Sequence, residues 1–231
     1  MSHCVALLSG GKDSVYTIVY LQKHGISIDC LLHLEPSKPK ESENNSYMFQ
    51  TALHEAIPYL AEAMNIPLIN YQFESNSSIC IDSNYVPTQN DEIENLYLGV
   101  KEVLNKFPQI DSICCGAIAS TYQSNRLKNV ANRCGLKVLV PLWQKDQKEV
   151  LNEIIESNLD VRLVKVCSMG LNQNDIGNVV GEGGEFESFV FDGPSFKKRL
   201  EVDFDVITEL EDDYAPICYM NIKSIHCIDK N

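Results

Sequence analysis

Short apolar runs alternate with amphipathic segments along the first part of the chain. Five apolar runs have the length and composition of buried strands: 4–8, 28–34, 67–73, 111–117 and 137–140. Four segments between them place apolar side chains at helical spacing: 14–24, 47–64, 91–106 and 124–134. Because strands that alternate with helices pair in parallel, the pattern predicts an α/β fold with a doubly wound, five-stranded parallel sheet.

Beyond Trp143 the pattern changes to one helix followed by separate alternating runs. The expected elements are one helix and three strands: 145–157, 161–167, 201–207 and 217–227. This order is typical of an α+β unit. We therefore divide the chain into a parallel-sheet domain at 1–143 and a smaller α+β domain at 144–231.

The composition and charge of the chain narrow its class of function. Hydrophobic residues make up 44% and charged residues 22% of the 231 residues, as in ordinary globular proteins. The formal net charge of -13 disfavours a nucleic-acid partner, because binding to a phosphate backbone requires cationic side chains. No apolar run is long enough to span a bilayer, and no basic segment precedes the first one. We expect a cytoplasmic protein with no membrane contact and no direct nucleic-acid binding.

The cysteines do not follow a disulfide or zinc pattern. There are nine, an odd number, several lie in apolar strand-like runs, and no two are spaced as C-x-x-C. The five histidines are scattered along the chain. We expect buried, reduced thiols and no structural zinc site.

The most informative segment is Ser9-Gly10-Gly11-Lys12-Asp13-Ser14, which joins the first expected strand to the first expected helix. Paired glycines let the backbone approach an anion, the two serines add hydroxyl donors, and the lysine adds a positive charge. The helix that follows presents its N-terminus to negative charge. The segment therefore predicts a loop that binds pyrophosphate.

Other interpretations of this loop depend on its spacing. It has neither the spacing of a Walker A loop nor that of the G-x-G-x-x-G fingerprint, which disfavours kinases and dinucleotide dehydrogenases. The simplest alternative is a tight turn in which Asp13 or Ser14 caps the helix. That alternative explains neither the paired glycines nor the lysine.

A second glycine-rich segment, GEGGEFES at 181–188, carries three carboxylates. Its glycines would allow Glu182, Glu185 and Glu187 to approach one ligand without crowding. Carboxylates repel phosphates, so their partners would be an ammonium ion, a cationic substrate group, Mg²⁺ or a proton in transfer. An acidic hairpin turn without a ligand is the alternative.

The loop at 9–14 resembles the SGGxDS motif of PP-loop ATP pyrophosphatases, which also lies between a first strand and a first helix. This resemblance implies ATP and Mg²⁺ as cofactors, and cleavage of ATP between its α- and β-phosphates to activate an oxygen as an adenylate. Lys12 and Asp13 would be catalytic, with Asp13 also contacting the metal. The expected nucleotide-binding residues are Ser9, Gly10, Gly11, Lys12, Asp13, Ser14, His33 and Gly116.

Further blocks, in order along most of the chain, resemble the diphthine–ammonia ligase family. They are SYMFQ at 46–50, HEAIP at 54–58, GAIASTYQ at 116–123 with Arg126, PLW at 141–143, GEGGEFES at 181–188, FVFDGP at 189–194 and FKKR at 196–199. The resemblance implies catalytic roles for Glu185 and Glu187. It implies substrate-binding roles for Tyr47, Gln50, His54, Glu55, Tyr122, Gln123, Arg126, Glu182, Gly183, Gly184, Glu185 and Glu187. For Tyr122 and Gln123, simple helix packing is an equal alternative.

The family resemblance implies one reaction. ATP adenylates the carboxylate of diphthine on elongation factor 2, and ammonia then displaces AMP to form the amide. Residues 1–143 would bind ATP and residues 144–231 the substrate, whose trimethylammonium group suits an acidic or aromatic pocket. Because the sequence contains no glutaminase domain, free ammonium is the expected nitrogen source. Whether the chain forms a homodimer stays open.

The chain departs from the family pattern at several positions. Phe186 and Ser188 replace the usual Tyr and Thr, so no phenol can act at position 186. Lys128 stands where a Glu is expected, and the segment between Leu171 and Gly181 is shorter than in relatives.

Two other functions stay open. A PP-loop enzyme that activates a tRNA base carbonyl is disfavoured by the acidic charge, by the lack of paired C-x-x-C clusters and by the acidic segment at 181–188. A regulatory protein without catalysis would bind ATP yet release no pyrophosphate. Lys12 and Asp13 count mildly against this second alternative.

Overall fold

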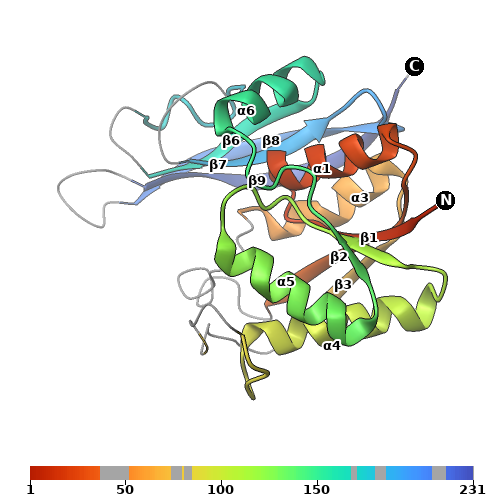
Figure 1. Ribbon diagram of the computed structural model, residues 1–231. Coiled ribbons are helices and arrows are strands. Elements are labelled where there is room, and N and C mark those ends of the chain that lie inside the picture. Colours follow the sequence, from red (N-terminus) through yellow and green to blue (C-terminus); the bar gives the residue numbers. More distant parts are fainter. Residues whose placement is uncertain are drawn as a thin grey trace.

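Two β-sheets organise the chain in the computed structural model, one parallel and one antiparallel (Figure 1). The structure describes residues 1–36, 52–73, 80, 85–167, 171–179, 186–209 and 217–230. The parallel sheet has five strands in the order β3-β2-β1-β4-β5. Their bounds are β1 His3–Leu7, β2 Ser27–Pro36, β3 Leu68–Phe73, β4 Ser112–Cys114 and β5 Lys137–Leu139. The predicted five-stranded parallel sheet is therefore confirmed, although β4 is shorter than the apolar run that contains it.

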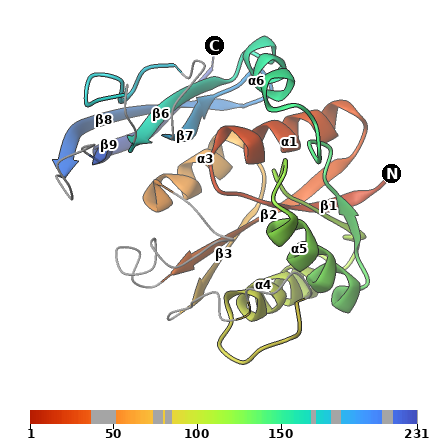
Figure 2. The same ribbon diagram turned by 60° about the vertical axis from the view of Figure 1, so that its left-hand side comes forward.

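Helices cover both faces of the parallel sheet (Figure 2). The helices α1 (Lys12–Lys23) and α3 (Ile57–Met64) pack in one apolar core, and α4 (Glu92–Lys106) and α5 (Thr121–Cys134) pack in the other. Strand order and the two helical layers together match the predicted doubly wound arrangement. In such folds the loops at the carboxyl ends of the strands carry the ligand site.

The second sheet lies over α1 and α3. Its four antiparallel strands follow the order β7-β6-β9-β8. They are β6 Asp160–Val166, β7 Phe186–Asp192, β8 Lys198–Glu209 and β9 Ile217–Asp229, preceded by the helix α6 Gln147–Glu156. One continuous core joins β1, α1 and α3 to buried side chains of this sheet, among them Phe189 and Phe191. The domain boundary at residue 143 stays a prediction, because the residues on its two sides share this core.

Two local predictions differ from the structure. The helix expected at 47–64 is described only as a 3-10 turn at His54–Ala56 and the helix α3 from Ile57, while Ala52 and Leu53 are not helical. Pro58 explains this start, because a proline lacks the amide that an inner helical position must donate, yet it fits the first turn. Strand β7 was not predicted, since its residues were interpreted as the end of a glycine-rich loop.

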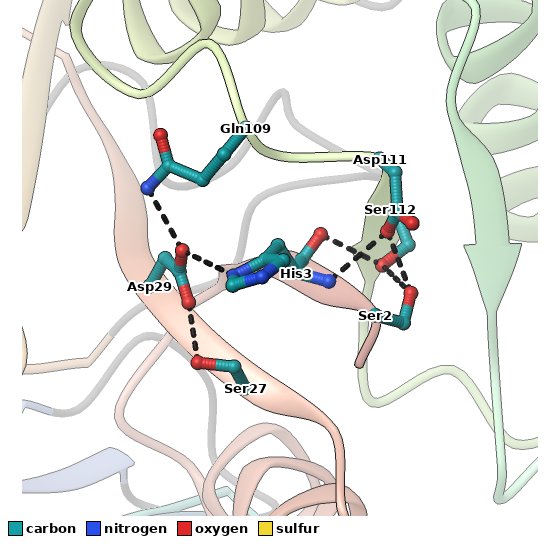
Figure 3. A network of polar contacts seen from close by, with 7 residues as sticks. All are labelled: Ser2, His3, Ser27, Asp29, Gln109, Asp111 and Ser112. Carbon is teal, nitrogen blue, oxygen red and sulfur yellow. Dashed lines mark hydrogen bonds and ion pairs between the residues drawn. The ribbon is translucent and has the colours of Figure 1, made fainter.

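The amino end of the parallel sheet is closed by a network of polar side chains (Figure 3). Asp29 accepts hydrogen bonds from Ser27 and Gln109 and pairs with His3 Nδ1 at 2.8 Å. Burial raises the pKa of Asp29, but these hydrogen bonds outweigh it and hold the pKa below its usual value. On the other side of β1, Asp111 accepts from the Ser2 hydroxyl and from the His3 amide, at 2.6 and 3.1 Å. The network ties β1 to both neighbouring strands.

All nine cysteines are free thiols in the structure. The prediction that they are buried holds for five of them, whereas Cys80, Cys134 and Cys227 are half-buried and Cys167 is exposed. None of the helices in the described ranges combines the length and the apolar character that a bilayer crossing requires.

Candidate functional site

The loop at 9–14 connects β1 to α1 in a conformation that exposes helix amides. Gly10 has a φ of +80°, which favours glycine, and Gly11 is the N-cap of α1 without a side-chain cap. The alternative in which Asp13 or Ser14 caps the helix is therefore wrong. The Ser14 hydroxyl instead donates to the Gly11 carbonyl at 2.9 Å and accepts from Ser9 at 3.1 Å. The first amides of α1 have no acceptor inside the helix, which makes them donors for an anion.

Gly116, in the loop after β4, lies directly against the phosphate-binding loop. A Cβ atom at this position would lie 2.6 Å from both the carbonyl carbon of Asp13 and the amide nitrogen of Ser14. These are backbone atoms at the start of α1, so they cannot move aside as a flexible side chain would. Gly116 is therefore part of the predicted nucleotide site by close packing, because only glycine allows this approach.

A cavity of about 270 Å³ opens beside this loop. Segments far apart in the sequence line it, among them the end of β1 with the loop at 9–14, the end of β2, Ala52, the loop after β4, the start of α5 and the start of β7. Of the predicted residues, those that line it are Ser9, Gly11, Lys12, Asp13, Ser14, His33, Gly116, Gln123 and Glu187. The structure thus brings the phosphate-binding loop and the end of the acidic segment to one place.

Lys12 and Asp13 form an ion pair that uses only one of the two carboxylate oxygens of Asp13. Lys12 Nζ lies 2.8 Å from Asp13 Oδ2. Asp13 Oδ1 is buried and accepts no hydrogen bond within the described part of the chain. A buried carboxylate oxygen without a partner is costly and fits a cation. Since the described residues contain no cluster of three or more metal-ligating side chains, such a cation would need further ligands from a bound phosphate.

His33, which lines the cavity, forms a buried hydrogen-bonded pair with His54. His33 Nδ1 lies 2.8 Å from the Leu8 carbonyl, and His33 Nε2 lies 3.0 Å from His54 Nδ1. A carbonyl only accepts, so His33 Nδ1 carries the proton and His33 Nε2 accepts from His54. Burial lowers the pKa of His33 to about 4 and also lowers the pKa of His54. Both rings are therefore neutral near pH 7, and His33 Nδ1 donates to the carbonyl that follows β1. The nucleotide-binding role of His33 stays a prediction.

The start of β7 places two polar side chains at the cavity. Glu187 lies 3.3 Å from Lys165 of β6, across the strand pair. Ser188 accepts a hydrogen bond from the Lys12 amide at 3.3 Å. Sequence reasoning missed Ser188, although its place at the end of the acidic segment was a usable signal. It also missed Cys115, where burial raises the pKa of the thiol to about 11 and keeps it uncharged.

Tyr122 and Arg126, predicted to bind substrate, lie in a buried cluster outside the cavity lining. The Arg126 guanidinium stacks 3.3 Å from the centre of the Tyr122 ring and donates to the Cys80 carbonyl. Tyr122 donates to Glu92 at 3.2 Å. Glu55 lies exposed on the 3-10 turn before α3. Substrate-binding roles for these residues stay predictions.

Several predicted residues lie outside the described residues, so the structure places none of them. They are Tyr47, Gln50, Glu182, Gly183, Gly184 and Glu185.

Two family models match the chain. The model of the diphthamide synthase N-terminal domain matches residues 2–138, and that of the diphthamide synthase C-terminal domain matches residues 177–228. The first match covers the parallel sheet with the phosphate-binding loop, and the second covers β7, β8 and nearly all of β9.

Curated relatives extend this similarity over nearly the whole chain. A Danio rerio protein named diphthine–ammonia ligase is 36% identical over 248 residues, which cover 98% of this chain and 96% of the relative. The Homo sapiens protein of that name is 36% identical, covering 97% and 92%. The Schizosaccharomyces pombe protein of that name is 36% identical over 95% of this chain, which spans only 39% of that longer relative.

A solved structure, described as a predicted subunit of tRNA methyltransferase from Methanocaldococcus jannaschii, is 13% identical with a TM-score of 0.43. The match covers 71% of this chain and 79% of that one. A likeness at that level carries no argument about function.

Proposed function

This chain belongs to the diphthamide synthase family, and we propose that it is a diphthine–ammonia ligase. On this proposal the substrate is the carboxylate of diphthine on elongation factor 2, the nitrogen donor is free ammonium, and ATP is converted to AMP and pyrophosphate. The reaction would take place in the cytoplasm.

One observation carries the chemical part of the proposal. Two motifs that are more than 160 residues apart in the sequence line one cavity. The loop at 9–14 brings helix amides and Lys12, which suit pyrophosphate, while β7 brings the carboxylate of Glu187, which suits a cation. An enzyme that joins ATP cleavage to attack by ammonia needs both kinds of group in one place.

The proposed reaction has two steps. First, an oxygen of the diphthine carboxylate attacks the α-phosphorus of ATP, the bond to the bridging oxygen breaks, and pyrophosphate leaves with that electron pair. Lys12 and the first amides of α1 would hold the charge that develops on pyrophosphate. Second, ammonium releases one proton to solvent, the nitrogen of the resulting ammonia attacks the acyl carbon, and the bond from that carbon to the phosphate oxygen of AMP breaks. The nitrogen then loses a second proton, and we assign Glu187 as the carboxylate that accepts it.

Mg²⁺ fits the residues present. Asp13 Oδ1 is buried without a partner among the described residues, and Mg²⁺ is commonly held by one or two carboxylates together with substrate phosphates. When bound, Mg²⁺ would neutralise charge on the pyrophosphate leaving group. The part of Asp13 is to hold the ion, and the part of Lys12 is to hold the carboxylate of Asp13 through its ion pair.

The test combines two products in one assay. Purified protein is incubated with ATP, Mg²⁺, isotopically labelled ammonium and diphthine-bearing elongation factor 2, and AMP, pyrophosphate and the mass of the modified residue are followed. We expect AMP release that requires both the factor and ammonium, and label in the product amide. Lys12→Ala should lower kcat/KM for ATP by about 100-fold or more, because it removes a charge aimed at the leaving group.

Lys23→Ala is the matched control, because Lys23 lies exposed at the far end of the same helix. This control should keep wild-type activity. Nucleotide binding without AMP release under any condition would overturn the ligase proposal in favour of a regulatory nucleotide-binding protein. AMP release that depends on a tRNA instead of the factor would favour a tRNA-modifying enzyme.

A further inference from the structure

Strand β7 of the second sheet is fixed to the phosphate-binding loop of the first sheet. The Val190 amide donates to the Gly10 carbonyl at 3.0 Å. The ring of Phe189, which is fully buried, lies so close to Gly10 that a Cβ atom there would be 2.2 Å from a ring carbon. The two sheets therefore meet at the loop itself, and β7 cannot leave it without exposing a buried aromatic ring.

This attachment holds Ser188 at the start of helix α1. The backbone carbonyl of Ser188 lies 3.4 Å from where a Cβ of Gly11 would stand. The hydroxyl of Ser188 accepts from the Lys12 amide at 3.3 Å, which is long for a hydrogen bond to nitrogen. The same amide is one of the helix donors that an anion would use. Ser188 therefore stands at the position that a phosphate oxygen would approach.

The hydroxyl of Ser188 has one more hydrogen bond to make. A serine hydroxyl donates one proton and accepts at two lone pairs. No acceptor for its proton is found among the described residues, and the side chain lines the cavity. An oxygen of a bound phosphate would supply that acceptor. The hydroxyl protons of Ser9 and Ser14 differ in this respect, because they are already donated to Ser14 and to the Gly11 carbonyl.

We propose that Ser188 is a binding residue for the pyrophosphate part of the nucleotide, supplied to the phosphate-binding loop by the second sheet. Its proton is donated to a phosphate oxygen, and its lone pair holds the Lys12 amide in place. This inference rests on the proposed function only in taking ATP as the ligand. Because Ser188 and Glu187 are neighbours in β7, the strand that binds the phosphate also carries the carboxylate of Glu187.

The experiment compares two ligands in three variants. Ser188→Ala removes the hydroxyl, Ser188→Thr keeps it, and Ser224→Ala makes the same change on the exposed face of β9. Dissociation constants for pyrophosphate and for AMP are measured by calorimetry in the presence of Mg²⁺, with thermal unfolding of each variant. We expect Ser188→Ala to weaken pyrophosphate binding about tenfold and to leave AMP binding within about twofold. Ser188→Thr and Ser224→Ala should bind both ligands as the wild type does.

The two ligands separate a binding role from a structural one. Equal weakening for pyrophosphate and AMP in Ser188→Ala, or no weakening for pyrophosphate, would overturn the inference. So would a failure of the wild type to bind pyrophosphate. A wild type that binds pyrophosphate through Ser188 but forms no AMP would refute the proposed ligase activity alone. If the wild type is an active ligase but Ser188→Ala binds pyrophosphate as tightly as the wild type does, this inference alone is refuted.

Discussion

The two ends of the parallel sheet are built on opposite principles. At the amino end, polar side chains pair with one another across three strands (Figure 3). At the carboxyl end, donors and acceptors are left for a ligand: the first amides of α1 have no acceptor in the helix, and Asp13 Oδ1 has no partner within the described ranges.

This difference indicates that the amino end of the sheet contributes mainly to stability and the carboxyl end mainly to ligand binding. A satisfied network gains hydrogen bonds at little desolvation cost, so the amino end stabilises the sheet. The carboxyl end keeps a buried carboxylate oxygen of Asp13 that has no hydrogen-bond partner among the described residues, and such an oxygen lowers stability. Such a cost is expected at a binding site, where the ligand supplies the missing partner.

Apart from Lys12→Ala, the largest effect is expected for Gly116→Ala. The added Cβ would meet the backbone of Asp13 and Ser14 at 2.6 Å, so the start of α1 must shift. We expect a loss of about 1–3 kcal/mol in the free energy of unfolding and a fall of about 100-fold in kcat/KM for ATP. Urea unfolding and steady-state kinetics measure both.

The control for this substitution is Gly25→Ala. A Cβ at Gly25 meets nothing within 4 Å, and this glycine has a positive φ of +78°. It should lower stability through backbone strain without changing the ATP kinetics. A Gly116→Ala enzyme with normal kinetics would show that the loop tolerates displacement.

An intermediate effect is expected for His33 at acid pH. The pKa of His33 is lowered to about 4 in the folded protein, against about 6.5 in an unfolded chain. The unfolded state therefore binds more protons between these values, and stability is lost as the pH falls from about 6.5 to about 4. At pH 5 the loss from this group is about 2 kcal/mol relative to pH 7.5.

His33→Asn removes this titration while keeping an amide donor for the Leu8 carbonyl. The variant should be less stable at neutral pH but should lose about 2 kcal/mol less than the wild type between pH 7.5 and 5. Urea unfolding at both pH values measures the difference. An identical loss in both proteins would mean that His33 is not held neutral by burial.

The smallest effect is expected at the amino end, for Asp29→Asn. The substitution weakens the hydrogen bonds from Ser27, Gln109 and His3, and we expect a loss of about 1–2 kcal/mol. Because the pKa of Asp29 is lowered in the folded state, its stabilisation is present above the unfolded pKa and disappears as the pH falls through the folded pKa. The difference from wild type should therefore shrink below about pH 4. A changed KM for ATP in Asp29→Asn would contradict the view that the amino end of the sheet contributes to stability and not to ligand binding.

Much of the fold could be predicted because the spacing of apolar residues along the chain indicates most of its strands and helices. Short apolar runs located all five parallel strands within a few residues, and apolar side chains at helical spacing did the same for the helices α1, α4, α5 and α6. The start of α3 was misplaced because an apolar period alone does not show that Pro58 belongs to a first turn. Strand β7 was missed because neighbouring glycines favour a loop, whereas pairing with β6 fixes those residues as a strand.

The sequence by itself determined the glycine-rich motif at 9–14, the acidic segment and the resemblance to a family, because these depend on residue types at close spacing. Tertiary structure decided which groups meet: Ser188 with the Lys12 amide, Gly116 with the backbone of α1, and His33 with His54. It also placed Arg126 in a buried cluster with Tyr122, away from the cavity lining. These contacts join residues from different strands and from both sheets, and their geometry follows from packing, which no local spacing encodes.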